Sequence, residues 1–403
     1  MTSVSSLAAS AQSGTDIRLW QRVAFDGMRV LGIAADPLNP GRVYALAALP
    51  GSRFSPSNSA DFYRSDNGGE TWRQVSTVGS YSVVGIGISA TGRIWIPEIR
   101  GPGYVSDDEG ETWMRGSQPI QVSAFAIAPS NPSRMYVTGS LGLVDRSDDG
   151  GLTWTEETLG TRGCTQGSIA VDPVDADIVY VGGGCGLHKS QDGGATWVQL
   201  LDLYAVMVLV NPTNPGIVYG GNASLRITGR IDERRGLWRS GDAGITWTNQ
   251  SEQPGSISLL IFDRRDATFS TLVARGSYEL FWSPDAGSSW TPLGMPTDTT
   301  LLPFPWAASN TVAVGDRLLV GYGNGMWATM LPPERPQPSG STPSRQGLER
   351  TTQAVLPDGT CDAPHDLVVV ACAAAWFRTR HAPVLMRNDD KLPANEFELG
   401  PLA

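Results

Sequence analysis

The sequence contains few of the residues that metal binding and acid–base chemistry most often use. It has three histidines and four cysteines among 403 residues, and none of them lies at the spacing of a zinc site. We therefore expect no bound metal and no cofactor. Basic residues are also few, with 30 Lys and Arg against 40 Asp and Glu and a net charge of −10. Because nucleic acids and anionic membranes need a broad basic surface, the composition argues against both partners.

Long apolar segments are missing as well. No run reaches the roughly 18–20 apolar residues that a membrane-spanning helix needs. Residues 1–16 are small and polar, lack the apolar core of a secretory signal, and are expected to form a flexible N-terminus. From the sequence alone we expect a soluble monomer without a membrane span, cytoplasmic by default.

Glycine, proline and tryptophan are abundant instead, with 47, 28 and 13 residues, which is typical of an all-β protein rich in turns. An octapeptide of the form Ser-x-Asp-x-Gly-x-Thr-Trp occurs six times, its serines 41, 41, 43, 50 and 43 residues apart: SDNGGETW (65–72), SDDEGETW (106–113), SDDGGLTW (147–154), SQDGGATW (190–197), SGDAGITW (240–247) and SPDAGSSW (283–290). A period of about 40 residues predicts one four-stranded sheet per repeat, the unit of a β-propeller.

Each conserved letter of this octapeptide has a structural interpretation. The Asp or Asn at the third position can accept hydrogen bonds from backbone amides of a turn, and the glycine two residues later can take a positive φ. The tryptophan can pack between neighbouring sheets. Six equivalent copies around a ring cannot converge on one substrate, so we interpret these residues as structural and not as catalytic acids or calcium ligands.

The remaining segments predict seven blades. Apolar inner strands are expected at 30–37, 83–90, 123–130, 167–173, 206–212 and 258–263, each followed by a second strand. After the sixth octapeptide, PWAASN (305–310), DRLLVGYG (316–323) and GMWAT (325–329) supply three more strands. The segment IRLWQRVAF (17–25) resembles ETWRQVST (70–77), so we predict that this N-terminal strand completes blade seven and closes the ring.

The octapeptide resembles the Asp-box, or BNR repeat, of sialidases, xyloglucan-degrading glycosidases, sortilin-type receptors and plant photosystem assembly factors. The resemblance covers about residues 17–330 and implies an all-β, seven-bladed β-propeller with Asp-box turns. Beyond it, 331–350 is a Pro/Ser-rich linker. Residues 351–403 form a tail of unknown structure, whose apolar run 366–377 is too short to span a bilayer.

Function is expected on the loops that rim the channel, where rigid scaffolds carry their binding residues. The longest loop, 222–236, explains the 50-residue spacing, and two shorter clusters lie at Glu98 and at Arg275. Arginines suit carboxylate contacts and acids suit sugar hydroxyls or proton transfer. The candidate ligand-binding residues are Arg100, Arg226, Arg230, Arg275 and Tyr278, and the candidate catalytic acids are Glu98, Asp232 and Glu233.

The catalytic patterns of the resembling enzymes are incomplete here. Sialidases carry an early Phe-Arg-Ile-Pro segment, but this N-terminal strand reads LWQRVAF (19–25). Tyr278 and Glu279 could imitate the sialidase nucleophile pair, but adjacent strand residues point to opposite faces. Xyloglucan-degrading relatives carry an Asp after an early Val-Tyr-Ala strand, where the first acid here is Asp61. We favour a binding or assembly module for a protein or glycan, with a divergent glycoside hydrolase as the alternative.

The cysteines leave two alternatives open. If Val171 pairs with Ile178 in an antiparallel hairpin, the same register places Cys164 opposite Cys185, which permits a disulfide. Without a signal peptide, two reduced core cysteines are the other interpretation.

Overall fold

The computed structural model describes the segments that form the sheets and most of their short turns. All of them belong to the first of two units into which the chain divides, Met1–Gln337. The described residues are 20–49, 59–79, 82–117, 119, 121–139, 142–159, 166–202, 205–222, 236–251, 253–255, 257–276, 279–296 and 310–333. The predicted N-terminus, linker and tail (1–16, 331–350 and 351–403) lie outside these residues, except for 331–333.

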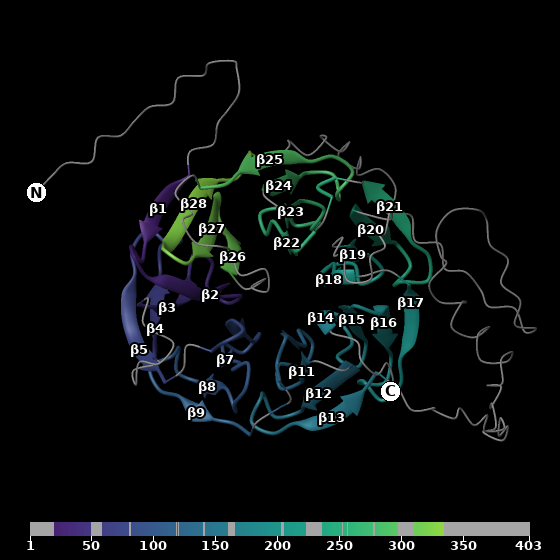
Figure 1. Ribbon diagram of the computed structural model, residues 1–403, viewed down its shortest axis with the longest axis horizontal. Coiled ribbons are helices and arrows are strands. Elements are labelled where there is room, and N and C mark those ends of the chain that lie inside the picture. Colours follow the sequence, from purple (N-terminus) through teal and green to yellow (C-terminus); the bar gives the residue numbers. More distant parts are fainter. Residues whose placement is uncertain are drawn as a thin grey trace, which may run out of the picture. The chain divides into compact units, whose positions relative to one another are not determined.

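The described strands form seven four-stranded antiparallel sheets, arranged as the blades of a ring (Figure 1). Blades one to four consist, from the inner to the outer strand, of β2 (Arg29–Ala35), β3 (Val43–Ala48), β4 (Ala60–Ser65) and β5 (Arg73–Val78); β6 (Gly87–Ile88), β7 (Ile94–Ile96), β8 (Tyr104–Ser106) and β9 (Met114–Arg115); β10 (Ala124–Ile127), β11 (Met135–Thr138), β12 (Leu143–Ser147) and β13 (Thr155–Thr158); and β14 (Gln166–Val171), β15 (Val179–Gly183), β16 (Gly186–Ser190) and β17 (Val198–Leu201). The predicted seven-bladed β-propeller is confirmed.

Blades five to seven follow the same order. They consist of β18 (Ala205–Val210), β19 (Val218–Asn222), β20 (Gly236–Ser240) and β21 (Thr248–Ser251); β22 (Leu259–Phe262), β23 (Leu272–Arg275), β24 (Leu280–Ser283) and β25 (Thr291–Gly294); and β26 (Thr311–Val314), β27 (Arg317–Tyr322), β28 (Gly325–Met330) and β1 (Gln21–Ala24).

The N-terminal strand closes the ring, as predicted. Strand β1 pairs antiparallel with β28, with Gln21 opposite Ala328. The innermost strand of this blade is β26, however, which begins directly after the segment 305–310 that the sequence analysis assigns to it. That assignment was wrong because β26 and β27 are joined by a two-residue turn, Gly315 and Asp316, with Val314 opposite Arg317. The sequence analysis expected a longer connection and therefore placed the inner strand too early.

The six octapeptides form one hydrogen-bonded turn each. In the second blade, the Ser106 Oγ accepts from the Gly110 amide at 2.8 Å and donates to Asp108 Oδ1 at 2.8 Å. Asp108 in turn accepts from the Thr112 amide at 2.9 Å and from the Thr112 hydroxyl at 2.6 Å. The predicted role of the third residue in binding backbone amides is therefore confirmed. These acids hold turns together around the ring.

The glycine of the turn in blade two is needed for two reasons. Gly110 has a φ of +88°, and a Cβ added there would lie 2.2 Å from Cε1 of Phe62 in the preceding blade. The turn of one blade therefore presses its backbone against the side chains of the blade before it. Since no side chain larger than hydrogen fits, this position links local turn geometry to the packing of blades.

The tryptophans pack between blades, as predicted. The ring of Trp113 meets that of Phe62 edge to face, with centroids 5.0 Å apart, and its Nε1 donates to the Ser76 Oγ of blade one at 2.9 Å. Trp154 of blade three similarly contacts Trp95 of blade two at 5.2 Å. Each aromatic pair contributes about 0.5–1.5 kcal/mol beyond its buried area.

In blades three and four, a cationic side chain on the strand before the turn adds a second link between blades. The Lys189 Nζ donates to the carbonyl oxygen of Ala243 in the next blade at 3.0 Å, and the Arg146 Nη1 donates to that of Gly193 at 3.2 Å. In blade one, Arg42 reaches Glu109 of the next turn at 2.7 Å. Much of the charge on this side of the ring is therefore used in structure.

The register of blade four differs from the prediction. Val171 pairs with Val179, not Ile178, and a bulge between Gln166 and Ser168 then shifts the register so that Gln166 lies opposite Gly183. Cys185 is disulfide-bonded, whereas Cys164 lies outside the described residues. The error arose because a bulge, which inserts one unpaired residue, leaves no clear mark in an apolar sequence.

The antiparallel order gives the ring two faces. One, here called the turn face, carries the octapeptide turns and the hairpin turns between the first two strands of each blade. The other, here called the loop face, carries the connections between the second and third strands and between blades. None of the described segments forms a helix of the length and apolarity needed to cross a membrane.

Candidate functional site

Three of the residues predicted for function are described, and these three lie at the loop face. Glu98 and Arg100 follow β7 in blade two, and Arg275 ends β23 in blade six. The other candidates lie outside the described residues: Arg226, Arg230, Asp232, Glu233 and Tyr278. The structure does not bring Glu98 and Arg275 together, since two blades separate them on one side of the ring and three on the other (Figure 1).

Glu98 is a buried carboxylate with an arginine partner. It is 7% exposed, and its Oε2 accepts from Arg115 Nη2 at 2.8 Å. Gly101 passes so close that a Cβ there would lie 2.2 Å from Oε2. The Arg115 guanidinium also lies over the ring of Tyr104, 4.1 Å from its centroid. Glu98 is thus held by a charge-assisted hydrogen bond whose donor is fixed by a cation–π contact.

Arg100, which the sequence analysis groups with Glu98, makes a different contact. Its Nε lies 3.4 Å from Gln121 Oε1, a long and exposed hydrogen bond. The partner of Glu98 is Arg115, which sequence reasoning missed because it lies on the outer strand of the blade. No feature of the sequence points to it, because Arg115 reaches Glu98 through the antiparallel pairing of Tyr104 with Arg115.

Arg275 is half-buried, and no carboxylate forms an ion pair with it among the residues that the structure describes. Burial lowers its pKa. Tyr322, a buried neighbour from blade seven, has its pKa raised to about 12 by burial and donates to the Met295 Sδ at 3.3 Å. A guanidinium in this state has the donors to bind a carboxylate through two parallel N–H groups.

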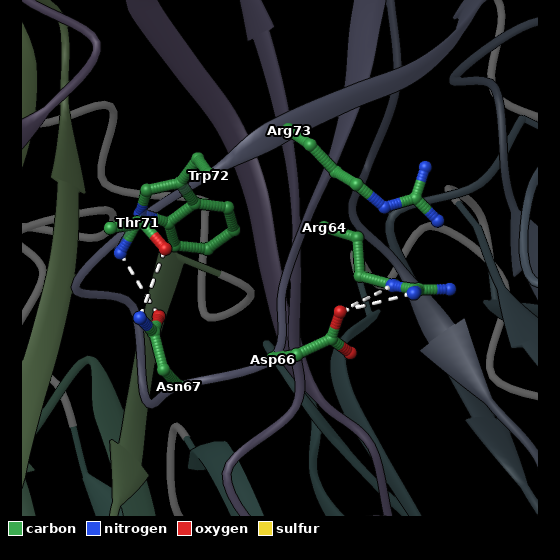
Figure 2. Close-up of a pocket in the computed structure, with 6 residues that line it drawn as sticks. All are labelled: Arg64, Asp66, Asn67, Thr71, Trp72 and Arg73. Carbon is green, nitrogen blue, oxygen red and sulfur yellow. Dashed lines mark hydrogen bonds and ion pairs between the residues drawn. The ribbon is translucent and has the colours of Figure 1, made fainter.

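A pocket of about 230 Å³ lies on the turn face, at the octapeptide turn of blade one (Figure 2). Figure 2 shows Arg64 bound to Asp66 on one side and Asn67 bound to Thr71 on the other. The pocket is lined by Arg64, Asp66, Asn67, Thr71, Trp72 and Arg73. The sequence analysis did not single it out, because it treats all six turns as equivalent.

The described part of the chain contains no group of three or more His, Cys, Asp or Glu side chains arranged to hold a metal ion. His188 is buried, and burial lowers its pKa. It therefore packs as a neutral side chain in blade four.

Comparison with known proteins gives matches in structure but not in sequence. No protein-family model matches the chain, and no curated protein matches its sequence significantly. Among solved structures, an ancestral GH74 enzyme matches with a TM-score of 0.55 and 15% identity over 78% of this chain and 46% of that one. A YCF48 structure with a bound D1 peptide matches with a TM-score of 0.54 and 12% identity over 80% of this chain and 98% of that one.

A third structure is the extracellular domain of BT4673 from B. thetaiotaomicron, with a TM-score of 0.55 and 13% identity over 78% of this chain and 40% of that one. The chain therefore spans less than half the length of the GH74 and BT4673 chains and nearly all of the YCF48 chain. At these identities the likeness shows the β-propeller fold.

Proposed function

We propose that this protein is an Asp-box propeller that acts as a binding or assembly module, and that its loop face captures a protein or glycan ligand through an acidic group. The observation that carries the proposal is that Arg275 is half-buried without a described acid partner. Its pKa is lowered by burial, and no described carboxylate neutralises it. Leaving a desolvated charge unpaired costs free energy that a ligand carboxylate would offset.

The state of Glu98 supports binding over catalysis. A glycoside hydrolase needs two carboxyl groups that flank the scissile bond. Glu98 already accepts from Arg115, so its Oε2 is engaged within the protein. Of the three acids that the sequence offers as candidates, Glu98 is the one that the structure describes.

The extent of the structural matches also favours a binding role. The chain covers 98% of a YCF48 structure that was solved with a bound D1 peptide, but 46% of the matched GH74 enzyme. A divergent glycoside hydrolase remains the second candidate because of that GH74 likeness. It would require Asp232 or Glu233 to lie across the channel from Glu98, about 5–10 Å away.

Binding screens with the full chain test the proposal. We would apply it to arrays of glycans and of acidic peptides, and measure each hit by calorimetry with the Arg275→Gln variant. Arg264→Gln is the control, because Arg264 is an exposed arginine at the turn face of the same blade. Affinity at least tenfold weaker for Arg275→Gln and unchanged for Arg264→Gln would support the proposal.

Two results would contradict it. Equal binding by the Arg275→Gln variant would remove the group on which the proposal depends. Hydrolysis of a glycan hit, abolished by Glu98→Gln, would establish the enzyme instead. In that case the Glu98 carboxylate would have to exchange Arg115 for substrate during the reaction.

A further inference from the structure

The turn that forms the pocket in blade one differs from the other five in the direction of one hydrogen bond. In those five, a Thr or Ser hydroxyl donates to the Asp at 2.5–2.6 Å: Thr112 to Asp108, Thr153 to Asp149, Thr196 to Asp192, Thr246 to Asp242 and Ser289 to Asp285. In blade one the acid is replaced by Asn67, and its Nδ2 donates to the Thr71 Oγ1 at 2.9 Å (Figure 2).

The orientation of the Asn67 amide is fixed by its other contacts. Its Oδ1 accepts from the Thr71 backbone amide at 3.0 Å and from the Ser65 Oγ at 2.9 Å. Because both partners are donors, the oxygen must face them and the nitrogen must face the Thr71 hydroxyl. The Thr71 hydroxyl therefore accepts a hydrogen bond from Asn67. In the other five turns the equivalent hydroxyl donates one to the Asp.

This reversal leaves two protons unused within the turn. A threonine hydroxyl has one proton, and a side-chain amide has two. The Thr71 proton is not taken by Asn67, and one N–H of Asn67 has no acceptor among the described residues. Both groups are exposed at the pocket. The third position of this turn is uncharged, where its five equivalents carry a carboxylate, although the octapeptide keeps two other acids, Asp66 and Glu70. An incoming anion therefore meets no negative charge at that position.

Arg73 adds a cation to the same pocket, and blade one is the only blade with a cation after the tryptophan of its octapeptide. The other five residues at that position are Met114, Thr155, Val198, Thr248 and Thr291. Arg73 is 46% exposed, and its Nη2 lies 3.5 Å from Glu111 Oε1, at the long limit of a hydrogen bond. The planar guanidinium can therefore turn to a ligand and offer two parallel N–H groups.

Asp66 also lines the pocket, but its charge is already neutralised. Arg42 Nε donates to its Oδ1 at 2.8 Å, and Arg64 Nη2 lies 3.0 Å from its Oδ2. Although burial opposes the shift, the hydrogen bonds from these arginines lower the pKa of Asp66. Asp66 therefore remains ionised and engaged on its side of the pocket, opposite Asn67 and Thr71 (Figure 2).

We propose that this pocket binds a carboxylate group the size of an aspartate or glutamate side chain. Arg73 would contact both oxygens, and the Thr71 hydroxyl and the Asn67 amide would each donate one hydrogen bond. The volume of about 230 Å³ suits such a group and not a larger metabolite. Since the pocket lies on the turn face, this proposal is independent of the function assigned to the loop face.

The test is an NMR titration of the full-length protein with acetate at constant ionic strength, observing the Thr71 amide. Saturable shifts are expected, with a dissociation constant of about 1–50 mM because the donors are exposed. The Asn67→Asp variant restores the hydrogen bond of the other five turns, and Arg73→Thr gives the residue of blades three, five and six. Each is expected to weaken binding at least fivefold, while the melting temperature of Asn67→Asp stays unchanged or rises.

If Arg73→Thr does not fold, the proposal can be tested by building the same site into another blade. Asp192→Asn combined with Val198→Arg gives blade four the two features of blade one, and it should create a second saturable response, seen at the Thr196 amide. The proposal is overturned if acetate causes no saturable shift in the unmodified protein, if Asn67→Asp binds acetate equally well, or if phosphate binds and acetate does not.

Discussion

The indole Nε1 of Trp20 donates to the backbone carbonyl oxygen of Leu293 at 3.1 Å, although the two residues are 273 positions apart in the chain. Trp20 precedes β1 and packs into the cluster between blades six and seven, beside Trp282 and Leu293. The two ends of the propeller sequence therefore meet at one side chain, which takes the place that an octapeptide tryptophan occupies in the other blades.

Replacing Trp20 with alanine should therefore open the closure of the ring. We expect the free energy of unfolding to fall by about 2–4 kcal/mol, somewhat less than for a fully buried tryptophan. Trp20→Phe keeps most of the packing and loses the hydrogen bond, so a loss of about 1 kcal/mol is expected. Chemical denaturation measures both. Equal stability of Trp20→Ala and the unmodified protein would show that β1 contributes nothing to closure.

Gly110→Ala should test whether the octapeptide glycine is needed for packing as well as for its φ. The new methyl group would lie 2.2 Å from Phe62, and φ is +88°. The expected loss is about 2–5 kcal/mol, which combines a positive-φ cost of about 1–2 kcal/mol with overpacking. Gly41→Ala is the matched control, because its φ is +89° and nothing lies within 4 Å.

The control should lose only the conformational part, about 1–2 kcal/mol. Denaturation curves of the two variants give the difference directly. If Gly110→Ala and Gly41→Ala lose the same amount, the close approach of neighbouring blades has no energetic consequence.

Acid should weaken the turns together. Hydrogen bonds from Thr246 and Ser240 lower the pKa of Asp242 to about 2 from 3.8, and hydrogen bonds from the threonine of each turn lower that of Asp108 and Asp192. Because the folded-state pKa is the lower one, this stabilisation is complete above about pH 4 and is lost as pH falls toward 2. The melting temperature should drop across that window.

A variant can assign this acid response to the turns. Thr246→Val removes the hydroxyl that donates to Asp242 at 2.6 Å, so the pKa of Asp242, measured by carboxyl NMR, should rise toward its ordinary value. Thr248→Val is the control, since that hydroxyl contacts the Arg239 carbonyl oxygen instead. An unchanged titration of Asp242 in Thr246→Val would contradict the assignment.

The disulfide at Cys185 is expected to join Cys164. Gln166 lies opposite Gly183, and Cys185 lies two residues further on, in the turn between β15 and β16. Of the other three cysteines, Cys164 is the nearest to this hairpin in the sequence. Peptide mapping without reduction should recover the two cysteines in one linked fragment, and Cys185→Ala should lose about 3 kcal/mol of stability. Alkylation of Cys164 without reduction, or a link from Cys185 to Cys361 or Cys372, would contradict this pairing.

Part of the candidate site could be predicted from the sequence and part could not. The loop position of Glu98 and Arg275 follows from the strand order. The partner of Glu98 could not be predicted, since Arg115 becomes its neighbour only when β8 and β9 pair and the loop after β7 folds back. The register of blade four and the first strand of blade seven were misassigned for a similar reason, because a bulge and a two-residue turn leave little trace in composition.

The sequence by itself determined the architecture, because the repeated turn specifies its own conformation. The serine, the third-position acid or amide and the glycine complete a local hydrogen-bonded loop in every copy, and local interactions can be recognised from spacing alone. The tertiary structure decided which copies of the turn carry a candidate binding site in addition to their structural role. Asn67 and Arg73 differ from their counterparts by single letters, but only the folded blade brings them to one pocket beside Trp72. Arg275 differs from paired arginines only because the ring places no described acid beside it.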